Sequence, residues 1–156
     1  MRKVLLTLVV SLLVPALVSA ETWATAVSRK GERQIVFRYL KEMDPGNQRS
    51  KQTARIIIVW KYTSENGMPA QSERLRMEKL EDSLYPALVP DGFATLALVS
   101  TGENWREWVF YVKSEAEFFA RSKEALQGQS PYPIEIHAAP DPEWKTYEDF
   151  RKNVRE

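Results

Sequence analysis

The order of secondary-structure patterns along the chain predicts a single α+β domain with a ferredoxin-like core. Residues 54–138 show, in order, a strand, a helix, two strands, a helix and a strand, which is the split βαββαβ pattern. A further strand or hairpin is expected before residue 54, and a short helix after residue 138. No linker is long enough to divide the chain, so we expect residues 21–156 to form one domain.

Residues 1–20, MRKVLLTLVVSLLVPALVSA, have the pattern of a secretory signal peptide. Arg2 and Lys3 precede an apolar stretch from Val4 to Val18, and small residues follow up to Ala20. The alternative is a membrane-anchoring helix, but such a helix needs about 20 apolar residues and this stretch offers about 15. We therefore expect cleavage near Ala20, export by the general route, a periplasmic location and no stable membrane insertion of the mature chain.

The strands before residue 63 are indicated by β-branched and aromatic residues. Residues 33–40, RQIVFRYL, alternate so that Ile35, Phe37 and Tyr39 share one side. Residues 54–62, ARIIIVWKY, are apolar on both faces in their middle. That pattern is typical of a central strand.

Residues 72–86 predict a helix, because Met77, Leu80 and Leu84 recur at helical spacing. Leu88 would extend this stripe, but Pro86 is expected to stop or kink the helix.

Residues 93–100 and 106–113 predict a hairpin whose connection is TGENW, residues 101–105. A second helix is expected to start at Ser114, with Glu117 completing a capping box and Phe119 facing inward.

After a final strand at 132–138, the stretch DPEWKTYEDF at 141–150 predicts a helix that packs its aromatic residues on the sheet. Asp141 suits the N-cap, Pro142 the first helical position and Glu143 the positive end of the helix dipole. We interpret six residues as a structural C-terminal motif: Asp141, Pro142, Glu143, Trp144, Tyr147 and Phe150.

Composition argues against several classes of function. The chain has no cysteine and a single histidine, His137, so we expect no catalytic triad and no metal site. It also lacks glycine-rich phosphate loops, so we expect no cofactor. The whole chain has a net charge of +1, and without the two basic residues of 1–20 the balance is 20 minus 21, or −1. This near-neutral charge gives no reason to expect a nucleic-acid partner.

Two stretches, WREWVFYVKSEAEF and PYPIEIHAAPDPEWKTYEDF, resemble the C-terminal half of an uncharacterised bacterial family, domain of unknown function 695. The resemblance covers residues 51–150 and is weaker over 21–50. The ending is also similar to the RraB-type regulators of ribonuclease activity, whose fold is ferredoxin-like. That second resemblance supports the predicted fold, but not the same function, because an export signal would separate this chain from the ribonuclease. The first family has no established activity to carry over.

The hairpin stretch TGENWREW suggests a binding site at Trp105, Arg106 and Glu107, because aromatic residues and arginine are enriched at binding hot spots. The alternative is that Trp105 folds back onto the domain's own core while Trp108 points inward.

We expect a non-catalytic periplasmic module that binds or regulates an unknown envelope protein, for example through a sheet edge. The competing hypothesis is a carboxylate-dependent hydrolase acting on envelope sugars or peptides. Its acids would come from three groups: Glu78, Glu81 and Asp82; Glu103 and Glu107; and Asp141, Glu143, Glu148 and Asp149. A self-associating structural subunit is a third alternative.

Overall fold

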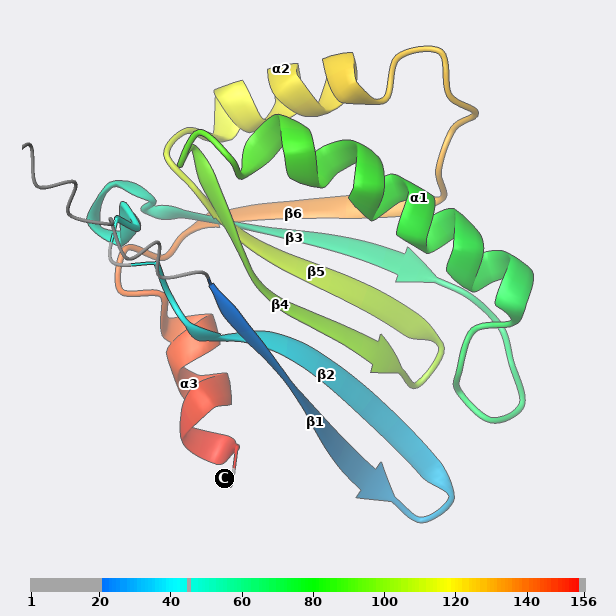
Figure 1. Cartoon of the computed structure of the whole chain (residues 1–156). Coiled ribbons are helices and arrows are strands. Elements are labelled where there is room, and N and C mark those ends of the chain that lie inside the picture. Colours follow the sequence, from blue (N-terminus) through cyan, green and yellow to red (C-terminus); the bar gives the residue numbers. More distant parts are fainter. Residues whose placement is uncertain (1–20, 45, 155–156) are drawn as a thin grey trace, which may run out of the picture.

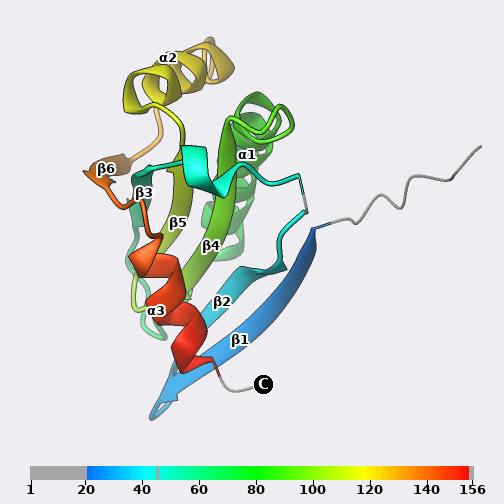
Figure 2. The same cartoon turned by 90° about the vertical axis from the view of Figure 1, so that its left-hand side faces the viewer.

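The computed structural model describes residues 21–44 and 46–154, and the predicted signal peptide lies outside these ranges. The described chain is an α+β domain in which one six-stranded antiparallel sheet carries helices on both faces (Figure 1). The strand order across the sheet is β1-β2-β4-β5-β3-β6. Figure 2 shows α1 and α2 on one side of the sheet and α3 on the other. The predicted α+β class is confirmed, and the N-terminal hairpin belongs to the same sheet as the four later strands.

The strands are β1 (Thr22–Lys30), β2 (Arg33–Glu42), β3 (Ala54–Lys61), β4 (Ala94–Gly102), β5 (Trp105–Val112) and β6 (Ile134–Pro140). The helices are α1 (Gln71–Leu88), α2 (Glu115–Ala125) and α3 (Lys145–Asn153), with a short 3-10 turn, η1 (Arg49–Lys51), before β3. Within the described residues, no helix has the length and apolar character needed to cross a bilayer.

The main core lies between the sheet and helices α1 and α2. Strand β3 is an interior strand paired on both sides, as its pattern predicted, and its Ile56, Ile58 and Trp60 are buried on the α1 side. The predicted stripe of α1 packs against them through four buried residues, Met77, Leu80, Leu84 and Leu88. This apolar face fixes α1 over β3, β4 and β5, because burying it removes hydrocarbon from water.

The helix was predicted to end at residue 86, where Pro86 would stop or kink it. This end point was wrong, because α1 continues to Leu88. Proline removes a single backbone donor, and the bond from the Val89 N–H to the Tyr85 carbonyl, 2.9 Å long, still closes the last turn. The burial of Leu88 offsets the cost of a proline at this position.

The β4–β5 hairpin is tighter than predicted. The strands are joined by only two residues, Glu103 and Asn104, with φ values of 52° and 70°. Positive φ at both central residues matches the twist of a two-residue hairpin, and asparagine tolerates it well. Trp105 therefore lies at the start of β5 and not in a loop.

Helix α2 confirms the predicted cap but corrects the predicted inward face. The Ser114 hydroxyl accepts a hydrogen bond from the Glu117 N–H at 3.3 Å. Phe118 is fully buried against Phe110, whereas Phe119 is 42% exposed. The neighbouring phenylalanines cannot both face the sheet, and the packing of α2 on α1 selects the first.

The C-terminal motif is structural, but its helix begins later than predicted. Asp141 is not at the N-cap position and Pro142 is not helical, because α3 starts at Lys145 after a turn in which Trp144 has a left-handed conformation, with φ of 57°. Asp141 still caps the helix from a distance. Its carboxylate accepts hydrogen bonds from the N–H groups of Lys145 (2.7 Å) and Thr146 (3.2 Å).

The turn places the Trp144 ring on the sheet. It stacks on Tyr111 with ring centroids 4.1 Å apart, and its indole N–H donates to the Gln52 carbonyl at 2.9 Å. Tyr147 is buried beside it, and Phe150 contacts Phe37 of β2. Glu143 and Pro142 remain exposed in the turn. The motif thus forms a second core on the face opposite α1.

Asp141 should be required for stability at neutral pH. It is 8% exposed, and it also accepts a hydrogen bond from the Tyr111 hydroxyl at 2.9 Å. Asp141→Asn should lower the free energy of unfolding by about 2 kcal/mol at pH 7, because each hydrogen bond to a charged group contributes about 1.5–3 kcal/mol and the amide cannot replace all three. Urea unfolding at pH 7 measures the difference.

The effect should depend on pH in a defined direction. Burial acts to raise the pKa of Asp141, but hydrogen bonds from Lys145, Thr146 and Tyr111 outweigh it, and the net pKa is lowered. The ionised carboxyl therefore contributes stability above its unfolded pKa, about 3.9, which is lost as the pH falls through the folded value. The difference between the parent and Asp141→Asn should therefore begin to shrink below about pH 4 and be lost below the folded pKa. A stability difference that stays constant to pH 3 would contradict this prediction. Asp149→Asn is the control, because it removes an exposed carboxylate of α3 and should change the free energy of unfolding little at either pH.

The two phenylalanines of α2 should respond oppositely to truncation. Phe118→Ala should lower the free energy of unfolding by about 3–5 kcal/mol, because it empties a buried site. Phe119→Ala should cost no more than about 1 kcal/mol, as expected for a half-exposed side chain. Urea unfolding of the two variants compares them directly, and equal losses would show that α2 is rotated relative to the structure.

Candidate functional site

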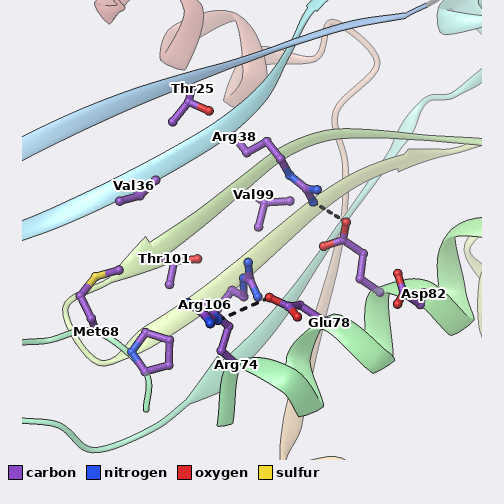
Figure 3. Close-up of a pocket in the computed structure, with 12 residues that line it drawn as sticks. Thr25, Val36, Arg38, Met68, Arg74, Glu78, Asp82, Val99, Thr101 and Arg106 are labelled. Atoms are coloured by element: carbon purple, nitrogen blue, oxygen red, sulfur yellow. Dashed lines mark hydrogen bonds and ion pairs between the residues drawn. The ribbon is translucent and has the colours of Figure 1, made fainter. Parts of the chain in front are cut away.

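The described chain has a polar groove beside α1 that no helix covers. Helices α1 and α2 lie over β3, β4 and β5, whereas the β1–β2 hairpin extends the sheet beyond them (Figure 1). The space left between α1 and β2 has a volume of about 590 Å³. Figure 3 shows Thr25, Val36 and Arg38 on its strand side and Glu78 and Asp82 on α1.

Glu81 connects the two walls of this groove. One oxygen of its carboxylate accepts a hydrogen bond from the Arg38 guanidinium on β2, and the other accepts from the Trp108 indole N–H on β5 at 2.8 Å. The Arg38 guanidinium also lies over the Trp23 ring of β1, 5.1 Å from its centroid. Both oxygens of Glu81 are therefore occupied in holding α1 to the sheet.

Arg106 lies in the floor of the groove and is held differently from Arg38. Its guanidinium lies 5.4 Å from the centroid of the Trp108 ring, on the α1 side of β5. Its Nε and Nη1 atoms are enclosed, and no acceptor in the described part of the chain reaches them. Buried polar groups ordinarily have partners, and an enclosed cation without one is costly.

The nearby acids compensate only part of the cost of burying the Arg106 charge. Burial lowers the pKa of Arg106, Glu81 and Glu78 act to raise it, and the nearby Arg38 lowers it further. The guanidinium nevertheless stays charged at neutral pH. Glu78 is engaged with Arg74, whose Nε lies 3.5 Å from the carboxylate (Figure 3). Of the three arginines that line the groove, Arg38 and Arg74 thus have acidic partners, whereas Arg106 has no ion pair among the described residues.

The structure divides the binding residues predicted from the sequence. Arg106 shares the α1 side of β5 with Trp108, whereas Trp105 and Glu107 alternate onto the face that carries α3. Trp105 is 44% exposed and does not fold back onto the core, and Glu107 lies 3.4 Å from the Ser100 hydroxyl. Trp108 points inward, as expected. Strand alternation thus divides the three residues between the two faces of the sheet.

Two charged groove residues were missed by sequence reasoning. Arg38 lies in β2 on the side opposite Phe37 and Tyr39, and Arg74 lies in the first turn of α1. In the sequence each looks like an ordinary solvent-facing charge, and only the packing of α1 beside β2 brings them together.

The acidic groups behind the hydrolase hypothesis are dispersed. Glu78, Glu81 and Asp82 line the groove from one helix. Near the C-terminus, Glu148 pairs with Arg49 at 2.6 Å and Asp149 with Lys145 at 2.5 Å. Glu103 lies 3.6 Å from Arg33 beside the hairpin turn. These acids mostly belong to surface ion pairs.

The single histidine lies on the outermost strand. His137 is exposed on β6, 3.5 Å from Glu135. Among the residues that the structure describes, no cluster of three histidine, cysteine or acidic side chains is arranged to hold a metal ion.

Comparison with known proteins places the chain in a family without assigning an activity. Residues 21–151 match the family of unknown function DUF695. The match includes β1 and β2, where the resemblance seen in the sequence was weaker. The similarity to RraB-type regulators stays a prediction. No curated protein matches the chain. The chain therefore belongs to the family of unknown function DUF695.

Proposed function

We propose that this protein is an exported, non-catalytic binding module whose partner presents a carboxylate to the groove beside α1. The observation that carries the proposal is Arg106, a charged side chain in the groove floor with two enclosed nitrogens that lack acceptors. A partner carboxylate beside it would supply the missing negative charge, and charge-assisted hydrogen bonds to arginine are among the stronger polar contacts.

The walls of the groove suit an acidic group of a protein or peptide. Arg38 and Arg106 come from the sheet, while Glu78 and Asp82 on α1 would repel an acid placed on their side. Such a division selects the orientation of a bound segment as well as its charge. Met68, Pro69, Val36 and Val99 supply apolar contacts to the same groove.

The groove favours binding over carboxylate catalysis. A two-carboxylate hydrolase needs acids that face each other across a cleft. Here all three acids come from α1, the opposite wall presents arginines, and both oxygens of Glu81 are engaged. This distribution is suited to holding an anion and not to placing an acid and a base around a scissile bond.

Export and the finer classification of the fold are part of the same proposal. Export to the periplasm is supported by the basic, apolar and small-residue pattern of residues 1–20. A ferredoxin-like unit over residues 54–140 is supported by the order β4-β5-β3-β6, with α1 and α2 on one side of these strands. The β1–β2 hairpin is then an addition that creates the groove.

Site-specific crosslinking tests the binding site. The chain has no cysteine, so Asp82→Cys at the exposed rim of the groove can carry a single photoreactive group. The protein would be purified from the periplasmic fraction, where its N-terminus is expected at Glu21, and exposed to envelope proteins. We expect a product that Arg106→Met reduces at least about tenfold, since losing one partner of a buried charge pair costs about 2–5 kcal/mol.

Two controls make this experiment decisive. The same photoreactive group on His137→Cys, on the exposed surface of β6, should not give the product. Lys145→Met removes an exposed cation of α3 and should leave the yield unchanged. A product that is insensitive to Arg106→Met, or no product at Asp82, would reject the groove as the binding site.

Stability measurements distinguish a binding arginine from a structural one. Arg106→Met should leave the free energy of unfolding unchanged or raise it by up to about 2 kcal/mol, because it removes an enclosed charge and keeps the contact with Trp108. The same change at the neighbouring Arg38 should lower it by about 1 kcal/mol, because Glu81 loses its cation at a partly exposed site. Urea unfolding compares the variants, and a large loss at Arg106 would assign it a structural role.

A further inference from the structure

The two edges of the sheet differ in how well they are protected against pairing. Strand β6 is seven residues long, carries Glu135 and His137 and ends at Pro140. Charges and proline are common protection for an edge. Strand β1 is nine residues long, contains no proline and is uncharged from Thr22 to Ser28. Its Val27 is 49% exposed. Among the described strands, β1 therefore has the edge better suited to pairing with another strand (Figure 1).

We propose that β1 pairs antiparallel with β1 of a second copy of this chain, about a twofold axis that passes beside Thr25. Two identical antiparallel strands in one sheet are related by an axis perpendicular to that sheet, so α1 of both copies lies on the same side. Opposed residues must then share a face, and the residue on the axis opposes itself. The six-stranded sheet would continue into that of the second copy.

The sequence of β1 is self-complementary in this register. On the α1 side, Thr25 would oppose Thr25, Trp23 would oppose Val27, and Glu21 would oppose Arg29 of the other copy. These are a hydroxyl pair, an aromatic and β-branched pair and an ion pair, each a favourable cross-strand combination. On the other side, only small residues meet, Ala24 with Ala26 and Thr22 with Ser28.

A register whose axis lies one residue further along β1 loses the ion pair. An axis beside Ala26 would place Trp23 opposite Arg29 and leave Glu21 opposite Gly31. The acid at one end of β1 then has no cation opposite it. Charge complementarity therefore selects Thr25 over Ala26 as the residue on the axis.

Among the described residues, no side-chain cation forms an ion pair with Glu21. Glu21 faces the α1 side, where its carboxylate lies 3.5 Å from the Tyr85 hydroxyl. Burial raises the pKa of Glu21, the Tyr85 hydrogen bond lowers it, and the nearby Asp44 raises it further. Arg29 is exposed at the other end of the strand. Pairing would bring this cation from the second copy to Glu21.

The dimer would join the two grooves. Thr25 lines the groove beside α1, so an axis at Thr25 places the grooves of the two copies next to each other on one side of the continuous sheet. This consequence rests on the proposed function of the groove, whereas the pairing itself does not. Pairing along one strand is small compared with a standard interface, so we expect a reversible dimer at about ten micromolar or above.

Single cysteines test the register, since the parent has none. Thr25→Cys should form a disulfide-linked dimer under mild oxidation, because directly opposed Cα atoms lie about 4.5–5.5 Å apart, within disulfide range. Val27→Cys is the matched control, because Val27 lies on the same face and is also exposed, but it opposes Trp23. We expect crosslinking of the Thr25 variant to be at least about tenfold faster. Equal rates, or crosslinking of Ala26→Cys instead, would overturn the proposed register.

Charge reversal tests the pairing without cysteine. Sedimentation equilibrium of the purified product of the full-length chain should show a weaker dimer for Glu21→Lys and for Arg29→Glu, each by about fivefold or more, because like charges then face each other. The double variant should return to within about twofold of the parent, since the ion pair is restored with reversed sign. A monomeric parent at every concentration, or no rescue, would overturn the proposal. Arg106→Met should dimerise normally, so failure of the groove proposal and failure of the pairing are distinguishable.

Discussion

The carboxylate of Glu81 is the contact on which the shape of this domain's polar face depends. It lies in the middle of α1 and accepts hydrogen bonds from Arg38 of β2 and Trp108 of β5. The apolar stripe of α1 secures the helix over the central strands, but it leaves the distance to β2 undetermined. The hydrogen bond to Arg38 sets that distance, so one acidic side chain fixes both walls of the groove. Removing one partner of this partly buried arrangement would leave the others without compensation.

The two sheet arginines of the groove consequently have different roles. Arg38 is neutralised by Glu81 and lies over Trp23, so its charge helps to hold the fold together. Arg106 lies two residues before Trp108 on the same face of β5, yet two of its side-chain nitrogens lack acceptors among the described residues. A fold can keep such a group when function requires it, since local polar rules are most often broken at functional sites. This contrast, more than the size of the groove, supports an anionic partner.

The opposite face of the sheet is covered by α3 and the turn that precedes it. The turn at residues 141–144 brings Trp144 onto Tyr111, and the Asp141 carboxylate satisfies the first free N–H groups of α3 from outside the helix. Helix α3 is nine residues long, which is too short to be stable alone in water, so its packing and this cap hold it in place. The result covers only one end of this face and leaves Trp105, at the other end of β5, half exposed.

Local patterns were sufficient for most of the fold. The α+β class, the interior position of β3, the buried stripe of α1 and the Ser114 cap follow from residue spacing, because strands repeat every two residues and helices every 3.6. They were insufficient where two neighbouring residues, or two possible helix ends, fitted the local pattern equally well. Phe118 and Phe119 are equivalent in sequence until α2 is placed, and the local pattern did not show that α1 continues past Pro86 to the buried Leu88. Of the three residues predicted to bind a partner, Arg106 lines the groove, whereas Trp105 and Glu107 lie on the other face. Their role in binding stays a prediction.

The sequence alone did not predict the groove. Its residues come from β1, β2, β4, β5, α1 and the segment before α1, and no single stretch of the chain carries them as a motif. Arg38 and Glu81 are 43 positions apart, and each alone resembles a solvated charge. Their partnership depends on the β1–β2 hairpin joining the edge of β4, which is a contact between distant segments. Spacing along the chain therefore determines which residues face a core, whereas the meeting of polar residues from separate elements is decided by long-range pairing of the strands.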